Sequence, residues 1–336
     1  LFSSQSHSRN DYDGYPAPNY TFADTGDFGK TDTNLNVASL THAFAKGQQV
    51  FSISETETKR NDFNPDHTPN FVAKGHIESA DYHISYALSD TTRLLGGVSY
   101  ERDTMRYAYP SSYDPSPVPQ KAASTLASLY GQISHDFGPL VVTGSARHDD
   151  ASSFGGLDIA QLSASLPAGD NWRFHASAGT GVKVPSLYQL YSDYGNPSLK
   201  PEKSQSLDGG IDYATTSGLF GATLFTRQVR DQIDFASCYG VVSAICTTHP
   251  YGYYDNIART KASGLELEAT QTLSDQWTIK GNYTFLTTRN EAAAFKGKRL
   301  PRTPGQMGSI DLAYAASAKL SLSLSVRYVG NSFDNA

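Results

Sequence analysis

Apolar and polar residues alternate one by one along much of this chain. In residues 320–328, every second position is Leu, Val or Tyr, and the positions between them hold Ser or Arg. Successive side chains of a β-strand point to opposite faces, so such a segment has one apolar face and one polar face. About 15 segments of this kind, most of them roughly 9–15 residues long, follow one another along the sequence. The pattern predicts an all-β protein.

The connections between these segments alternate in length. Short turns are expected at residues 45–48, 89–92, 136–139, 168–171, 215–218 and 274–276. Longer links are expected at residues 10–33, 61–71, 107–121, 181–201, 236–252 and 291–303. Short turns at one end and long loops at the other are typical of an outer-membrane barrel. Trp172 and Trp277 each follow a short turn, as an aromatic belt at one bilayer edge requires. We therefore expect an antiparallel transmembrane β-barrel.

The polar face of such a barrel points into its lumen. Seven charged residues fall on this face by parity: Arg173, Asp208, Asp212, Glu266, Glu268, Lys280 and Arg327. Charges are tolerated in a hydrated lumen, whereas on the lipid face they cost several kcal/mol at the bilayer midplane. The alternative is the solvent face of a soluble β-sandwich or repeat structure, which gives no reason for the regular segregation of loop lengths.

Composition excludes two classes of protein. The net charge of -6 argues against a nucleic-acid binder, which is normally basic overall or carries a basic patch. No stretch approaches 18 consecutive apolar residues, so the sequence predicts no membrane-spanning helix. The two cysteines, Cys238 and Cys246, lie in one loop-like stretch, as in a small disulfide loop formed in an oxidising compartment. Two free thiols are the alternative.

One long, ordered motif carries a family resemblance. Residues 179–191 read GTGVKVPSLYQLY and residues 194–204 read YGNPSLKPEKS. This stretch resembles the barrel of TonB-dependent outer-membrane receptors. Further matches follow in the order of the family, at residues 231–235, 254–257, 263–268, 283–286, 300–304 and 328–330. The resemblance implies a complete barrel of 22 strands, a size associated with plugged transporters. It also implies an N-terminal plug, so we expect residues 1–336 to be a barrel fragment lacking the plug, the first strands and the last strands.

Two further stretches resemble the vitamin B12 (cobalamin) receptors of that family. They are ARHDDASSFG at residues 146–155, and DYDGY followed by FADT between residues 11 and 25. The resemblance implies a calcium-binding extracellular loop with Tyr12 (through its carbonyl), Asp13 and Asp24 as ligands. Ca²⁺ takes six to eight oxygen ligands, and clustered Asp residues on a loop can supply some of them. The alternative is a polar, acidic loop without a metal.

Tyrosines are frequent in the long loops. Tyr188, Tyr191 and Tyr194 are the candidate substrate-binding residues, through stacking and hydroxyl contacts. The alternatives are an aromatic girdle or packing within the loop.

These observations predict a receptor and transporter rather than an enzyme. Gly179–Lys183 lacks the spacing of a phosphate loop, and the chain has no GxSxG nucleophile motif. We expect a protein of the Gram-negative outer membrane that takes up a large, scarce ligand, with TonB as its energising partner. Cobalamin is the favoured ligand, a ferric siderophore is the alternative, and a passive porin is a further possibility.

Overall fold

The computed structural model describes residues 1–14, 16, 18–19, 21–292 and 296–333. Within these residues, fifteen strands form one antiparallel sheet in which each strand pairs with the next along the chain. The strands are β1 (Phe2–Gly14), β2 (Ala23–Phe44), β3 (Gly47–Phe63), β4 (Pro69–Ala87), β5 (Thr92–Ala108), β6 (Gln120–Phe137), β7 (Leu140–Ala151), β8 (Gly155–Ala168), β9 (Trp172–Lys183), β10 (Glu202–Ala214), β11 (Gly218–Ala236), β12 (Tyr253–Thr272), β13 (Trp277–Asn290), β14 (Gln306–Ser317) and β15 (Leu320–Val329). Two short helices, α1 (Leu187–Tyr191) and α2 (Ala244–Thr248), lie in the connections. The predicted all-β antiparallel fold is confirmed.

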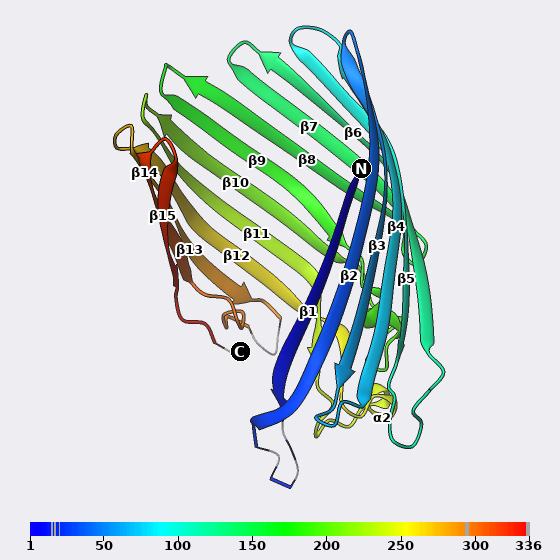
Figure 1. Cartoon of the computed structure of the whole chain (residues 1–336). Helices are drawn as coiled ribbons and strands as arrows, with labels where there is room; N and C mark the ends of the chain where they lie inside the picture. The colour runs from blue at the N-terminus through cyan, green and yellow to red at the C-terminus, as the bar shows by residue number, and fades with distance from the viewer. Residues whose placement is uncertain (15, 17, 20, 293–295, 334–336) are drawn as a thin grey trace.

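The sheet curves into a trough with β1 and β15 at its two edges (Figure 1). The short turns gather at one end of the trough, which is the upper end in Figure 1, and the long connections with α2 gather at the other. We call these the turn end and the loop end. No helix among the described residues is long and apolar enough to cross a bilayer.

The first long link is shorter than the sequence pattern predicts. A link was expected over residues 10–33, but β1 continues to Gly14, and β2 begins at Ala23 and continues for 22 residues. A strand needs only about 9–11 residues to cross a bilayer, so β2 extends well beyond that length. Its first half carries polar residues on both faces, and alternation cannot reveal a strand that has no apolar face. Main-chain pairing with β1 and β3 holds it instead.

The position of α1 identifies the concave face of the sheet. This helix lies between β9 and β10 in sequence, yet it contacts β5 and β6. The Tyr107 hydroxyl of β5 donates a hydrogen bond to the main-chain carbonyl of Tyr191 at 3.4 Å. A connection reaches so distant a strand only by crossing the concave side. Tyr107 shares its face of β5 with Ser99, which stands opposite Asp81 on β4. The polar face is therefore the concave, inner face.

The charged residues assigned to the lumen by parity follow this inner face. Asp212 stands opposite Arg173, and its carboxylate accepts a hydrogen bond from Arg173 Nε at 2.8 Å. The same carboxylate lies 3.2 Å from His175 Nδ1. The opposite, outer face is apolar: Leu224 stands opposite Leu265, which stands opposite Phe285. Leu224 is 66% exposed, so the apolar residues point away from the trough and its centre is not a dry core.

Candidate functional site

The segment from residue 184 to residue 201 folds inward at the loop end. Its single helical turn, α1, has a capping box. The main-chain N–H of Gln189 donates to Ser186 Oγ at 3.2 Å, and the main-chain N–H of Ser186 donates to Gln189 Oε1 at 3.0 Å. Such reciprocal bonds satisfy donors that the first turn of a helix leaves free. Leu190 and Leu199 bury their side chains in a small core with Ile233. Part of the family-like motif thus codes for a compact, capped loop.

Two asparagines fix this segment to β12. The Asn196 side-chain amide donates to the Tyr254 carbonyl at 3.1 Å. The Asn256 side-chain amide donates to the carbonyls of Lys200 and Asp231, at 2.9 Å and 2.6 Å. Its Oδ1 accepts from the Lys200 amide at 2.8 Å. Asn256 therefore joins three chain segments. This gives the asparagine of the YDNI stretch a structural role.

A cluster of aromatic rings lies where the inward segment contacts the wall. The ring of Tyr188 packs against Tyr107 and Tyr254, with centroid distances of 5.9 Å and 6.3 Å. The hydroxyl groups of Tyr188 and Tyr109 lie 3.3 Å apart. Tyr107 is only 2% exposed, so its ring lies inside this cluster. Sequence reasoning missed Tyr107 and Tyr109, because only the inward fold of the loop places them there.

The three candidate substrate-binding tyrosines have different surroundings. Tyr188 belongs to the aromatic cluster, and the ring of Tyr194 packs edge-on against Phe235 at 5.9 Å. The Tyr194 carbonyl also accepts a hydrogen bond from the Tyr254 amide at 2.9 Å. The Tyr191 side chain is 41% exposed, so of the three it is the ring most available for a ligand.

The candidate calcium ligands lie at the loop end of the β1–β2 hairpin, where the register shifts between Tyr12 and Gly14. The Tyr12 carbonyl accepts from the Thr25 hydroxyl at 3.4 Å, and Asp24 Oδ1 accepts from the Gly26 amide at 3.1 Å. No group of three or more His, Cys, Asp or Glu side chains that could hold a metal occurs in the described part of the chain. Tyr12, Asp13 and Asp24 thus lie on one hairpin, and calcium binding by these residues stays a prediction.

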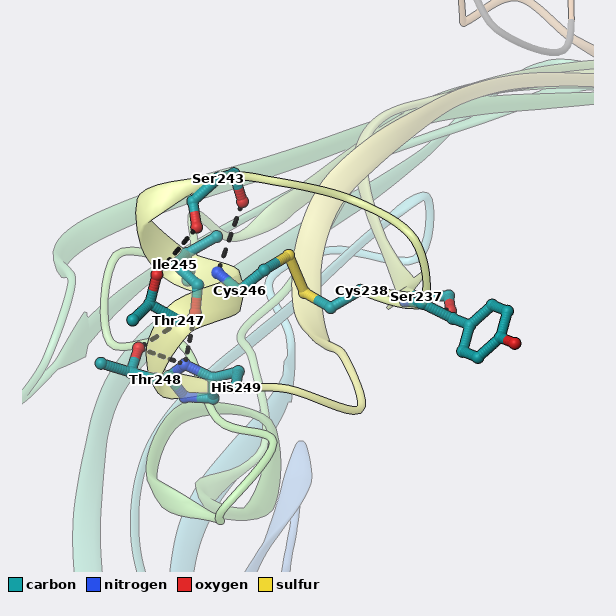
Figure 2. The surroundings of a disulfide bond; sticks show 9 residues. Ser237, Cys238, Ser243, Ile245, Cys246, Thr247, Thr248 and His249 are labelled. Atoms are coloured by element: carbon teal, nitrogen blue, oxygen red, sulfur yellow. Dashed lines mark hydrogen bonds between the residues drawn. A yellow bond between two sulfur atoms is a disulfide. The ribbon is translucent and has the colours of Figure 1, made fainter.

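Cys238 and Cys246 are joined by a disulfide in the β11–β12 connection (Figure 2). Their Cα atoms lie 5.4 Å apart, and Cys246 belongs to α2. The Cys246 amide donates to the side chain of the N-cap residue Ser243 at 3.3 Å. The bridge thus fastens one side of α2 to the chain that leaves β11.

The motif at residues 146–155 belongs to the wall of the trough. Arg147 Nε donates to Asp149 Oδ1 at 2.6 Å, and Arg147 also donates to the Ser128 hydroxyl at 2.7 Å. On the outer face, His148 Nδ1 lies 2.8 Å from Asp158 Oδ1. These polar side chains pair with one another along the strands.

Residues 2–336 match the family model described as TonB dependent receptor-like, beta-barrel. The chain belongs to this family. Barrels of the family lie in the outer membrane of Gram-negative bacteria and are receptors and transporters rather than enzymes. The family assignment agrees with the long motif in residues 179–204 and with the polar inner face of the sheet.

Several solved structures of receptors and of a transporter share the fold of this chain. The siderophore receptor PirA from Pseudomonas aeruginosa matches with a TM-score of 0.71 at 18% identity, over 91% of this chain and 56% of that chain. A double mutant of the ferric enterobactin receptor PfeA from the same organism matches with a TM-score of 0.74 at 17% identity, over 98% of this chain and 54% of that chain. The copper transporter OprC matches with a TM-score of 0.73 at 15% identity, over 94% and 54% of the two chains. The chain thus spans about half the length of these structures.

Proposed function

We propose that this chain is the barrel portion of an outer-membrane receptor that captures a metal chelate at its loop end. The observation that carries the proposal is the inward segment 184–201, which is fixed to the wall at the loop end of a polar, concave inner face and carries an exposed Tyr191. A ligand held there would lie over the hydrated interior of the barrel. Release into the cell would require TonB acting through a plug, as is typical of the family.

A ferric siderophore is better supported than cobalamin as the ligand. Two of the three solved structures described above are siderophore receptors, and the third is a copper transporter. The stretch at residues 146–155, which favoured cobalamin, forms paired contacts within the wall, and such contacts serve any ligand equally. We therefore propose uptake of an iron chelate and place cobalamin second, on the resemblance of the loop between residues 11 and 25.

Titration of the full-length receptor tests this order. The purified receptor is titrated with a ferric catecholate siderophore, with the same siderophore free of iron, and with cyanocobalamin. Tight binding of the ferric siderophore alone is the expected result. Tight binding of cyanocobalamin alone would mean that cobalamin, and not a ferric siderophore, is the ligand. Binding of none of the three would overturn the proposal of a metal-chelate receptor.

Calcium is proposed as an ordering ion for the β1–β2 hairpin. Tyr12 through its carbonyl, Asp13 and Asp24 would hold it, and other loops of the full-length receptor would complete the shell. Calcium would neutralise the two carboxylates and fix the end of the hairpin. We expect calcium to raise ligand affinity in the full-length receptor, and D13A combined with D24A to abolish the gain.

The matched control for this prediction removes two other carboxylates of the same hairpin. Asp11 and Asp27 lie on β1 and β2 beside the proposed ligands, and D11A combined with D27A should leave the calcium response intact. An equal loss in both double mutants would mean that only the charge of the hairpin matters.

A further inference from the structure

The loop-end part of β11 and β12 extends beyond the strands beside it. Among the described residues, β11 pairs with β10 as far as Arg230, and β12 pairs with β13 from Thr260 onward. Beyond these points the two strands pair with each other alone, over residues 232–236 and 253–258. We call this part the distal hairpin. A two-stranded hairpin is marginally stable by itself, so other contacts must hold it in place.

The inward segment 184–201 supplies such contacts. Ile233 of the distal hairpin packs against two leucines of the segment. The main-chain N–H of Tyr254 donates to the Tyr194 carbonyl at 2.9 Å, and the Asn256 side chain donates to the Lys200 carbonyl at 2.9 Å. These are ordinary lengths for N–H···O bonds, which are usually about 2.9–3.0 Å. The distal hairpin and the inward segment thus form one body, which we call the distal unit.

The strand ladder is irregular at the base of the distal hairpin. The register of β11 on β12 shifts between Val229 and Gln232 and again between Gln232 and Ile233. Asp231, inside this bulge, has a φ of 56°, in the left-handed region that residues other than glycine seldom adopt. A bulge leaves residues unpaired and bends its strand. The bulge is therefore the place at which the distal unit can turn against the wall below it.

One carboxylate spans the bulge. Glu202, the first residue of β10, accepts at Oε1 from the main-chain N–H of Ile233 at 3.2 Å and from Lys183 Nζ at 3.2 Å. The Glu202 side chain is only 12% exposed, so both bonds are sheltered from water. Glu202 thus connects β9 and β10 of the wall to the distal hairpin, and we call this connection the latch.

On its other side, the distal unit is held by longer bonds. The Tyr107 hydroxyl lies 3.4 Å from both the Tyr191 carbonyl and the Asp193 carboxylate, and the Tyr109 and Tyr188 hydroxyls lie 3.3 Å apart. Bonds between two oxygens are usually about 2.7–2.8 Å, so these are weak. Moving the inward segment alone would break the bonds on both of its sides. Moving the whole distal unit would break the latch and the weak bonds, and would keep the short ones.

We propose that the distal unit is a gate that turns about the bulge of β11, is held closed by Glu202, and separates from the wall between the inward segment and β5. When the gate opens, Tyr188 moves away from Tyr107 and Tyr109, and the aromatic cluster divides along this line. The exposed Tyr191 moves with the gate. The proposal concerns the movement of the chain and is independent of which ligand the receptor takes up.

Distances between spin labels in the full-length receptor test the gate. Labels on S198C and Q120C report across the line of separation, because Gln120 stands opposite Tyr107 on β6. Labels on S198C and D234C report within the distal unit. All three positions are exposed. Double electron–electron resonance is recorded on both pairs without ligand.

Removing the latch should open the gate. Hydrogen bonds to charged groups are among the stronger ones in proteins, so E202A should raise the ratio of open to closed receptor about tenfold, seen as a longer distance between positions 198 and 120. The distance between positions 198 and 234 should stay as in wild type. E202Q keeps an acceptor oxygen for Ile233 but loses the charge that pairs with Lys183, so its ratio should lie between the two.

The matched control is D208A, which removes another carboxylate of β10. Asp208 accepts from the Ser177 hydroxyl within the wall, so both label distances in D208A should equal those of wild type. Melting of each variant close to wild type shows that its barrel is folded.

Three results would overturn the gate. They are an unchanged distance between positions 198 and 120 in E202A, an equal change in D208A, and an equal broadening of the distance within the distal unit, which would mean that the segment unfolds instead of turning. Since no ligand is present, failure of the siderophore titration would leave this test unaffected.

Discussion

At the scale of single residues, Asn256 shows what residue patterns alone do not reveal. The YDNI stretch marks the family, but nothing in its letters says that the asparagine side chain bonds to Lys200 and Asp231, both distant in sequence. The roles of Tyr107 and Tyr109 were hidden for the same reason. The loop position of Tyr188, Tyr191 and Tyr194 was foreseeable, whereas their division into packed and exposed rings depends on tertiary contacts.

Replacing Asn256 should loosen the inward segment. N256A removes three hydrogen bonds and leaves main-chain groups without a partner, which costs about 1–3 kcal/mol per group where water is excluded and less where it is not. We expect limited proteolysis between residues 184 and 201 to become faster. N282A is the matched control, because among the described residues the Asn282 side chain bonds to the Ser309 hydroxyl within the strand wall, at 2.8 Å. Equal cleavage rates in both variants would contradict the bridging role of Asn256.

The exposed ring of Tyr191 should contribute to ligand capture. Removing an aromatic contact costs about 0.5–1.5 kcal/mol beyond the buried area, so Y191A should weaken ligand binding by up to about tenfold. Isothermal titration of the full-length receptor with the ferric siderophore measures the change. Y86A, which removes an exposed tyrosine from the wall, serves as the control and should leave affinity unchanged. Unaltered affinity in Y191A would remove Tyr191 from the site.

At the scale of elements, strands were predictable where one face is apolar and uncertain where both faces are polar. Alternation marks β15 from Leu320 to Val329, because Ser and Leu separate cleanly onto its two faces. Alternation fails over the first half of β2, which is a strand only because its main chain pairs with β1 and β3. Neither α1 nor α2 was predicted, since a helix of five residues is too short to show a period of 3.6.

The disulfide of the β11–β12 connection should restrain that connection and not the barrel. Peptide mapping without reductant should recover Cys238 linked to Cys246. In the chain-entropy account, closing so small a loop contributes about 2.5 kcal/mol. C238S combined with C246S should therefore speed proteolysis within residues 236–252 while the melting of the barrel stays close to wild type. Two alkylated thiols in protein taken from outer membrane would refute the linkage.

At the scale of the whole molecule, the sheet turns its apolar face outward and its polar face inward, the reverse of a soluble sandwich. Sequence parity sorted the residues onto the two faces correctly, because this sorting depends only on the period of two. The alternating loop lengths, which favoured a membrane barrel, predicted that the polar face points inward. The inward fold of segment 184–201 was not predictable, since it depends on contacts between β5, β6 and β12 that no local pattern encodes.

A pair of neighbouring substitutions tests the orientation. L224R places a charge on the outer face and should cost about 2–4 kcal/mol if it lies near the bilayer midplane. T223R places the same charge on the inner face, where Thr223 stands opposite Glu266. We expect L224R to reduce the yield of folded receptor in outer membrane, while T223R stays near wild type. Equal yields, or a stable monomer in buffer without detergent, would contradict a hydrocarbon-facing exterior.

The tether between segment 184–201 and two separate parts of the wall has a mechanical consequence. The segment leaves β9, contacts β5 and β6, and is hydrogen-bonded to β12, so it forms a strut between two parts of the wall at the loop end. Because β5 and β12 stand seven positions apart in the sheet, their separation at the loop end is restrained by this segment as well as by the pairing of the strands between them. Displacing the segment alone would therefore disturb its contacts with β5 and β6 and its hydrogen bonds to β12 together.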